Sequence, residues 1–164
     1  MHPLLKFLPT RWILNCVTLG PIGHFKKMPG TYGSFVGLIY YTLCFHSLQP
    51  MEYLLACLVS FYLACILCDE GEKILQKKDP SCIILDEMVA MPFCFLGLQK
   101  IMQVYPVWPF MLAGFVLFRC FDILKPLGIK KIQRLNGGLG VVLDDIVAAF
   151  VVCIILHLIV QFIK

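Results

Sequence analysis

Charged residues are scarce in this chain. Asp, Glu, Lys and Arg make up 15% of its 164 residues, and its mean hydropathy is +0.85. Soluble domains usually carry about 25% charged residues. The deficit argues against an ordinary soluble domain. A basic stripe with interleaved aromatic residues is also missing, so we expect no nucleic-acid partner.

Long segments contain no charge at all. Residues 35–51, 53–68, 101–118 and 146–163 lack Asp, Glu, Lys and Arg. About 18 apolar residues suffice for a helix to cross the roughly 30 Å hydrocarbon core of a bilayer. A fifth run, residues 88–99, would cover only about 18 Å as a helix. We therefore predict an all-α fold, a polytopic membrane bundle of four to five helices with one short or re-entrant. A soluble helical core is the alternative.

Proline and glycine divide the chain into elements of one domain, residues 1–164. Pro50 and Pro109 suit the first turn of a helix, where the missing N–H costs nothing, and Pro126 stops the helix before it. The boundaries that we predict follow. Helices cover about 34–49, 51–69, 86–100, 109–123 and 144–163, after an N-terminal segment 1–33 and with loops 70–85 and 125–143.

Lys and Arg are distributed unevenly over these elements. If five helices alternate in direction, twelve of the fourteen basic residues fall on one side, leaving only Lys100 and Lys164 on the other. Cytoplasmic loops carry the excess of Lys and Arg in membrane proteins. We therefore assign the basic side to the cytoplasm.

The cysteines and histidines show no metal or redox pattern. Cys65 and Cys68 form a CxxC within an apolar run, without a second CxxC or a paired histidine. We interpret them as buried apolar side chains. His46 and His157 lie inside predicted spans, and we interpret them as packing residues.

Five of the ten acidic residues occupy predicted helix ends. Asp86 and Glu87 start one helix, Asp122 ends the next, and Asp144 and Asp145 start the last. A start, an end and a start in successive antiparallel helices lie on the same side, here the cytoplasmic one. Asp86 or Asp144 alone could be a helix N-cap, and Asp122 could form a helix-end ion pair with Lys125, but Glu87 and Asp145 are not needed as caps. Together they predict one carboxylate cluster.

Clustered carboxylates repel one another and need cations. Arg119 and Lys125 flank Asp122 and could supply them; so could a divalent ion. Oxygen-only ligands favour Mg²⁺, which also binds substrate phosphates. The segments 29–34 and 136–140 contain glycines before predicted helices and could bind phosphate through N–H groups, although glycine is also ordinary turn chemistry.

Four motifs in order resemble the phosphatidylglycerophosphatase A family. PGTYGS at residues 29–34 is similar to the family's PGTxGS, and LDEMVA at 85–90 to its DE(F/V)VG. FRCFDILKPLGI at 118–129 is similar to FRxxDxxKPxPI, and NGGLGVVLDDIVAA at 136–149 to GGxGIMxDDxxAG. Gly128 stands at a usual proline, and Ala90 and Ala149 at usual glycines. All charged motif residues are present.

The resemblance implies a Mg²⁺-dependent lipid phosphatase of the bacterial inner (cytoplasmic) membrane. It would hydrolyse phosphatidylglycerophosphate to phosphatidylglycerol and phosphate, in glycerophospholipid biosynthesis. Its partner would be the phospholipid substrate within the membrane; the sequence sets no expectation for oligomeric state. The expected roles are as follows. Catalysis and metal binding fall to Asp86, Glu87, Asp122, Asp144 and Asp145, and substrate-phosphate binding to Arg119, Lys125, Thr31, Ser34, Gly30 and Gly138.

Other phosphatase chemistries lack their residues here. No cysteine precedes an arginine by six positions, no DxDx(T/V) is present, and no histidine lies near Arg and Lys in a catalytic pattern. The paired acidic sets of CDP-alcohol transferases are also absent. Two alternatives from other classes stay open: a small membrane transporter, which would place acidic residues at mid-span, and a non-catalytic membrane subunit, which would lack a convergent pocket.

Overall fold

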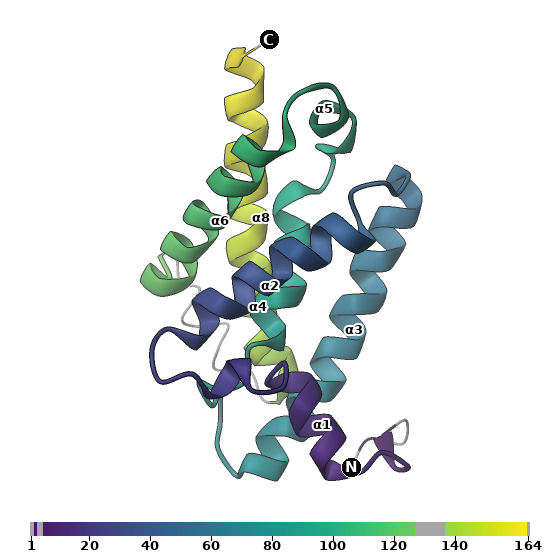
Figure 1. Ribbon diagram of the computed structural model, residues 1–164, viewed down its shortest axis with the longest axis vertical. Coiled ribbons are helices and arrows are strands. Elements are labelled where there is room, and N and C mark those ends of the chain that lie inside the picture. Colours follow the sequence, from purple (N-terminus) through teal and green to yellow (C-terminus); the bar gives the residue numbers. More distant parts are fainter. Residues whose placement is uncertain (1, 3–4, 127–136, 164) are drawn as a thin grey trace.

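The computed structural model describes residues 2, 5–126 and 137–163, and every regular element over these residues is helical (Figure 1). This confirms the all-α prediction. The α-helices are α1 (Thr10–Val17), α2 (Pro29–Cys44), α3 (Pro50–Leu75), α4 (Leu85–Ala90), α5 (Gln99–Val104), α6 (Val107–Leu124) and α8 (Gly138–Ile163). Two 3₁₀ turns, η2 (Ile22–His24) and η3 (Met91–Phe95), join them.

Three of these helices are long and apolar enough to cross a membrane: α3, α6 and α8. Their outer faces carry exposed apolar side chains such as Leu55, Leu112 and Ile154, which suit contact with lipid. Helix α2 has 16 residues and does not reach the length of a typical span. The charge-free run at 35–51 therefore does not form a further long span.

Local sequence signals determine where α3 begins and where α6 ends. Pro50 opens α3, and the Gln49 N–H donates to Glu52 Oε2 at 3.1 Å, which closes a capping box. Helix α3 continues to Leu75, so the predicted end at residue 69 is wrong. Helix α6 ends where Lys125 adopts a left-handed conformation (φ 42°) before Pro126, as the proline predicted.

The continuous helix predicted over 86–100 is wrong. The segment forms α4, then η3, then α5, because Pro92 provides no N–H for an α-helical bond and Gly97 reverses the chain at φ 81°. All five η3 residues are buried, and η3 packs against α8, α2 and α6. The short element thus runs through the centre of the bundle.

Two helix starts also differ from prediction. Helix α2 begins at Pro29, so residues 29–34 form its first turns instead of a loop before it. Helix α8 begins at Gly138, so Asp144 and Asp145 lie in its second turn and cap nothing. Gly137 turns the chain at φ 73° just before this start. Residue 136 of the predicted phosphate-binding segment 136–140 lies outside the described residues, as do residues 127–135 of the predicted loop 125–143.

The packing brings three helix ends together. Helix α8 lies between α3 and α6, and α4 packs against α2, α3 and α8 (Figure 1). A Cβ at position 138 would overlap the Cys65 carbonyl oxygen, so α8 approaches α3 this closely only because Gly138 has no side chain. The starts of α4 and α8 and the end of α6 consequently lie at one end of the bundle.

Candidate active site

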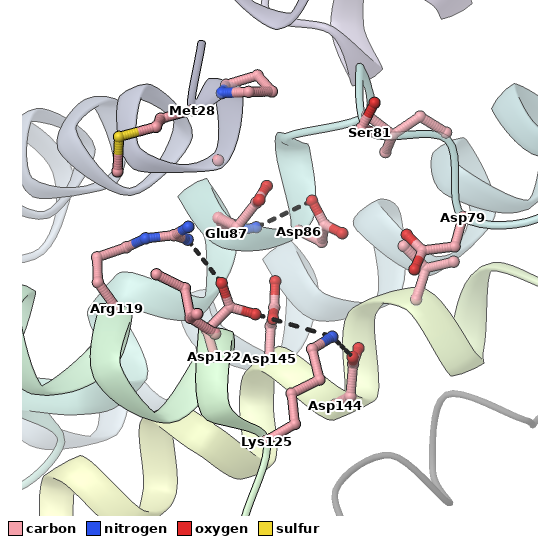
Figure 2. A pocket seen from close by; sticks show the side chains of 15 residues that line it. Met28, Asp79, Ser81, Asp86, Glu87, Arg119, Asp122, Lys125, Asp144 and Asp145 are labelled. Atoms are coloured by element: carbon pink, nitrogen blue, oxygen red, sulfur yellow. Dashed lines mark hydrogen bonds and ion pairs between the residues drawn. The ribbon is translucent and has the colours of Figure 1, made fainter.

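A cavity of about 360 Å³ opens where these helix ends meet (Figure 2). Its walls come from the start of α2, the segment 79–83, α4, the end of α6 and the start of α8. Six acidic and two basic residues line it. They are Asp79, Asp86, Glu87, Asp122, Asp144, Asp145, Arg119 and Lys125. All seven charged residues that the sequence singled out therefore face one cavity.

Three carboxylates converge at the centre of the cavity. Oxygen atoms of Asp86, Glu87 and Asp145 all lie within 4.8 Å of one another. Asp86 and Glu87 come from α4, and Asp145 from the second turn of α8, which packs against α4. Asp86 and Asp145 are only 6% and 4% exposed, so water screens their repulsion poorly.

These carboxylates have few hydrogen-bond donors. Asp86 Oδ1 accepts from the Glu87 N–H at 3.0 Å, but Glu87 Oε2 is buried without any hydrogen-bond partner. Burial is the main cause that raises the pKa of Glu87 to about 8, and the nearby charges of Asp145 and Asp122 raise it further. Burial and the Glu87 charge raise the pKa of Asp86 well above its usual value. A cation at this point would satisfy the unpaired oxygen.

The two basic residues are held at the side of the cavity by acidic partners. Arg119 Nη1 donates to Asp122 Oδ2 at 2.7 Å and to Ser34 Oγ at 3.3 Å. Lys125 Nζ donates to Asp144 Oδ2 and lies 3.8 Å from Asp122 Oδ1. Burial lowers the pKa of Lys125, but the bond to Asp144 and the nearby charges of Asp144, Asp145 and Asp122 together outweigh burial and raise the pKa overall. Asp122 thus holds both cations in place.

Glycine at position 30 lets α2 lie against this group. A Cβ there would overlap Glu87 Oε1 and would lie 3.2 Å from both terminal nitrogens of Arg119. The Gly30 carbonyl also accepts from Ser34 Oγ at 2.9 Å. The first turn of α2 therefore packs directly on a carboxylate and a guanidinium, and any other residue at position 30 would displace them.

The remaining predicted phosphate ligands lie apart from the cavity. Thr31 Oγ1 is buried without a hydrogen-bond partner and does not line it. Ser34 is fully buried and contacts Arg119. The Gly138 N–H faces α3 and donates to Asp69 Oδ1 at 3.2 Å, so it does not point into the cavity.

Sequence reasoning missed several residues that line the cavity, among them Asp79, Ser81 and Met28. Asp79 had a signal, since it is an acidic residue seven positions before Asp86 in the predicted loop. Figure 2 shows Asp79 and Ser81 on the side of Asp86, opposite Met28 and Arg119. No periodicity could reveal this placement, because it depends on how segment 79–83 folds over α4.

Comparisons with known proteins relate this chain to one family. The model of the family described as phosphatidylglycerophosphatase A matches residues 15–160. The chain is 34% identical over 148 residues to phosphatidylglycerophosphatase A of Haemophilus influenzae, covering 87% of this chain and 88% of that protein. It is 32% identical over 152 residues to the Escherichia coli protein of the same name, covering 90% and 83%.

A third relative carries a different name. A putative phosphatidylinositol-3-phosphatase of Bacteroides thetaiotaomicron is 36% identical over 124 residues, covering 73% of this chain and 76% of that protein. No solved structure matches the chain. All three relatives are named as phosphatases of phosphorylated lipids, and they differ in the headgroup that their names give.

Proposed function

This chain belongs to the phosphatidylglycerophosphatase A family, and we propose that it hydrolyses the terminal phosphomonoester of phosphatidylglycerophosphate to phosphatidylglycerol and phosphate. The observation that carries the proposal is the convergence of eight charged residues, six acidic and two basic, on one cavity at an end of a membrane bundle. Such a cavity suits a phosphate group at the membrane surface. Its helix-end position also speaks against a transporter, which would need charges at mid-span.

The donor set fits Mg²⁺. Asp86, Glu87 and Asp145 offer only oxygen atoms, and Glu87 Oε2 is buried without a partner. We propose that these three residues hold the ion. When bound, Mg²⁺ would neutralise charge on the phosphate oxygens. Asp122 and Asp144, which the sequence placed with the metal ligands, are bonded to Arg119 and Lys125, and we now propose that they position these two cations.

Arg119 and Lys125 would bind the phosphate oxygens. The planar guanidinium can donate two parallel hydrogen bonds, and the ammonium acts as a point charge. Both would act more strongly as charge develops on the phosphate during reaction. Ser34 and Gly30 would act indirectly, by holding Arg119 and by leaving room for it. In hydrolysis the oxygen of water bonds to phosphorus while the bond between phosphorus and the glycerol oxygen breaks. A carboxylate would accept a proton from the attacking water, and the glycerol oxygen would take up a proton and leave as the alcohol.

The cellular setting is part of the proposal. Lys73 lies near the end of α3, and Arg119 and Lys125 at the end of α6, on the cavity side of these two spans; an excess of basic residues there supports an active site that faces the cytoplasm. We propose the bacterial inner membrane as the location. The substrate would reach the cavity from the membrane itself. The product would serve glycerophospholipid biosynthesis.

Phosphate release from the purified protein tests the proposal. In mixed micelles, dioleoyl phosphatidylglycerophosphate should release phosphate with Mg²⁺, lose this activity with EDTA, and regain it when Mg²⁺ is restored. Phosphatidylinositol 3-phosphate is the matched second substrate, because one relative bears the name of a phosphatase for it. Release from that lipid alone would favour the second headgroup. Release from neither lipid would overturn the proposed function.

A further inference from the structure

The rim of the cavity is not charged throughout. Two of its lining residues, Met28 and Ile123, are apolar and are 62% and 61% exposed. We name these two residues the apolar lip. The other aliphatic lining residues, Ile83 and Val141, are buried and belong to the core. The apolar lip is thus where the charged cavity meets an exposed apolar surface.

The stability of the fold does not explain why a methionine occupies position 28. It occupies the N-cap position of α2 with a left-handed backbone (φ 51°, ψ 49°) and makes no side-chain cap hydrogen bond. Ser, Thr, Asp, Asn or Gly would serve better there, and a left-handed conformation is unfavourable for Met. Its side chain is neither a cap nor part of the core, and strain of this kind is typical of functional sites.

The apolar lip borders the phosphate-binding side of the cavity. Ile123 follows Arg119 by four positions on α6, so the two lie on one face of the helix. Gly30, two residues after Met28, packs on the Arg119 guanidinium. Figure 2 shows Met28 and Arg119 on the same side of the cavity. An amphipathic ligand would find a cation and an apolar surface next to each other here.

The chain around the apolar lip has the composition of a membrane interface. Phe25 is 48% exposed and packs edge-on against Tyr32, with ring centroids 5.1 Å apart, and Leu124 after Ile123 is 69% exposed. The exposed residues Lys26 and Lys27 stand between Phe25 and Met28. Apolar side chains would enter the acyl region while lysines contact lipid phosphates.

We propose that the apolar lip is a lateral portal, through which the substrate headgroup enters from the bilayer while its acyl chains stay outside, across Met28 and Ile123. This inference rests on the proposed function and adds the route and the binding surface for the diacylglycerol part. The phospholipid would never leave the membrane. Recognition would then have two parts: phosphate at Arg119 and Lys125, and hydrocarbon at the apolar lip.

Two substrates that share a headgroup test the portal. One is dioleoyl phosphatidylglycerophosphate in mixed micelles, and the other is its deacylated, water-soluble analogue. The double variant Met28→Gln with Ile123→Thr makes both positions polar and changes each side chain by only one heavy atom. We expect the ratio of kcat/KM for the long-chain lipid to that for the analogue to fall about tenfold, mainly through KM, because apolar contact is lost.

Val116→Thr with Leu112→Gln is the matched control, since both residues are exposed apolar positions of α6 that do not line the cavity. The control should keep the wild-type ratio. An unchanged ratio in the double variant, or an equal fall in the control, would overturn the portal. Met28→Gln alone, at an exposed position, gives the same test if the double variant unfolds. A wild-type protein that cleaves neither substrate would instead refute the proposed function.

Discussion

Two clusters of charged residues lie at the same end of the bundle, and they differ in how their charges are satisfied. In the first, on α3, Lys73 Nζ donates to Asp69 Oδ2 at 2.6 Å and to Glu70 Oε1 at 3.1 Å. Asp69 also accepts from the Gly138 N–H, and Glu70 accepts from the His2 N–H at 2.7 Å. Each carboxylate of this α3 cluster therefore has two donors.

The cavity cluster is arranged in the opposite way. Among the described residues that line it, six are acidic and two are basic, and Glu87 Oε2 has no partner at all. A buried carboxylate without donors is costly for folding. The α3 cluster links α8 to α3 through the Gly138 N–H, whereas the unpaired oxygen of the cavity cluster supports the proposal that a ligand with positive charge binds there.

The most direct test of the difference between the two clusters is to neutralise one carboxylate in each. Asp145→Asn replaces one carboxylate oxygen of a proposed Mg²⁺ ligand with an amide group and removes a negative charge from the cavity. We expect phosphate release to fall by at least about a hundredfold, as for loss of a group that acts in the transition state. Thermal stability without Mg²⁺ should stay the same or rise, because one of several mutually repelling charges is gone.

Asp69→Asn is the matched control for that variant. It keeps an oxygen that can accept from the Gly138 N–H and loses only the charge toward Lys73. Activity should stay within about threefold of wild type, because a partly exposed ion pair contributes little. Equal losses in the two variants would show that the clusters do not differ in function.

Mg²⁺ affinity of the cavity cluster should fall as the pH falls. The α3 cluster cannot cause this change, because it does not line the cavity. Burial raises the pKa of Glu87 to about 8, so this carboxyl is protonated below pH 8 in the metal-free protein. Binding must then displace a proton. The apparent affinity should weaken by at least about tenfold for each pH unit from 8 down to 6, and should level off above 8.

Titration calorimetry of the detergent-solubilised protein between pH 6 and 9 would measure this dependence. Glu87→Gln should give weaker binding with a shallower pH dependence, since Asp86, whose pKa is also raised, would still bind a proton. A dissociation constant that does not change between pH 6 and 8 would contradict the assignment of Glu87 as a ligand.

The location of the site could be predicted because charge patterning and helix alternation are both readable from sequence. Asp86, Glu87 and Asp122 lie at the helix ends expected for them. Asp144 and Asp145 reach the same cavity although α8 begins six residues earlier than predicted, because six residues lengthen a helix by only about 9 Å. An error in a helix boundary therefore did not move the site.

Contacts between distant segments could not be predicted. The role of Gly138 depends on Asp69, which lies 69 positions away and beside a helix end that the sequence placed too early. Met28 lines the cavity through a left-handed backbone that nothing in its residue type suggests. The pairing of Lys73 with Asp69 follows helical spacing and is readable from sequence, but the unpaired oxygen of Glu87 is visible only in three dimensions.

The smallest expected effect comes from Lys73→Met, which removes the cation of the α3 cluster and leaves the cavity untouched. The Lys73 side chain is 54% exposed, so its ion pair with Asp69 contributes little, but Glu70 is 4% exposed and would lose the Lys73 ammonium as a partner. We expect a loss of about 1 kcal/mol, seen as a fall of roughly 2–4 °C in the thermal unfolding midpoint. Phosphate release and Mg²⁺ affinity should stay near wild type. A large loss of Mg²⁺ affinity at unchanged stability would mean that the α3 cluster belongs to the site, because a purely structural contact cannot weaken metal binding without weakening the fold.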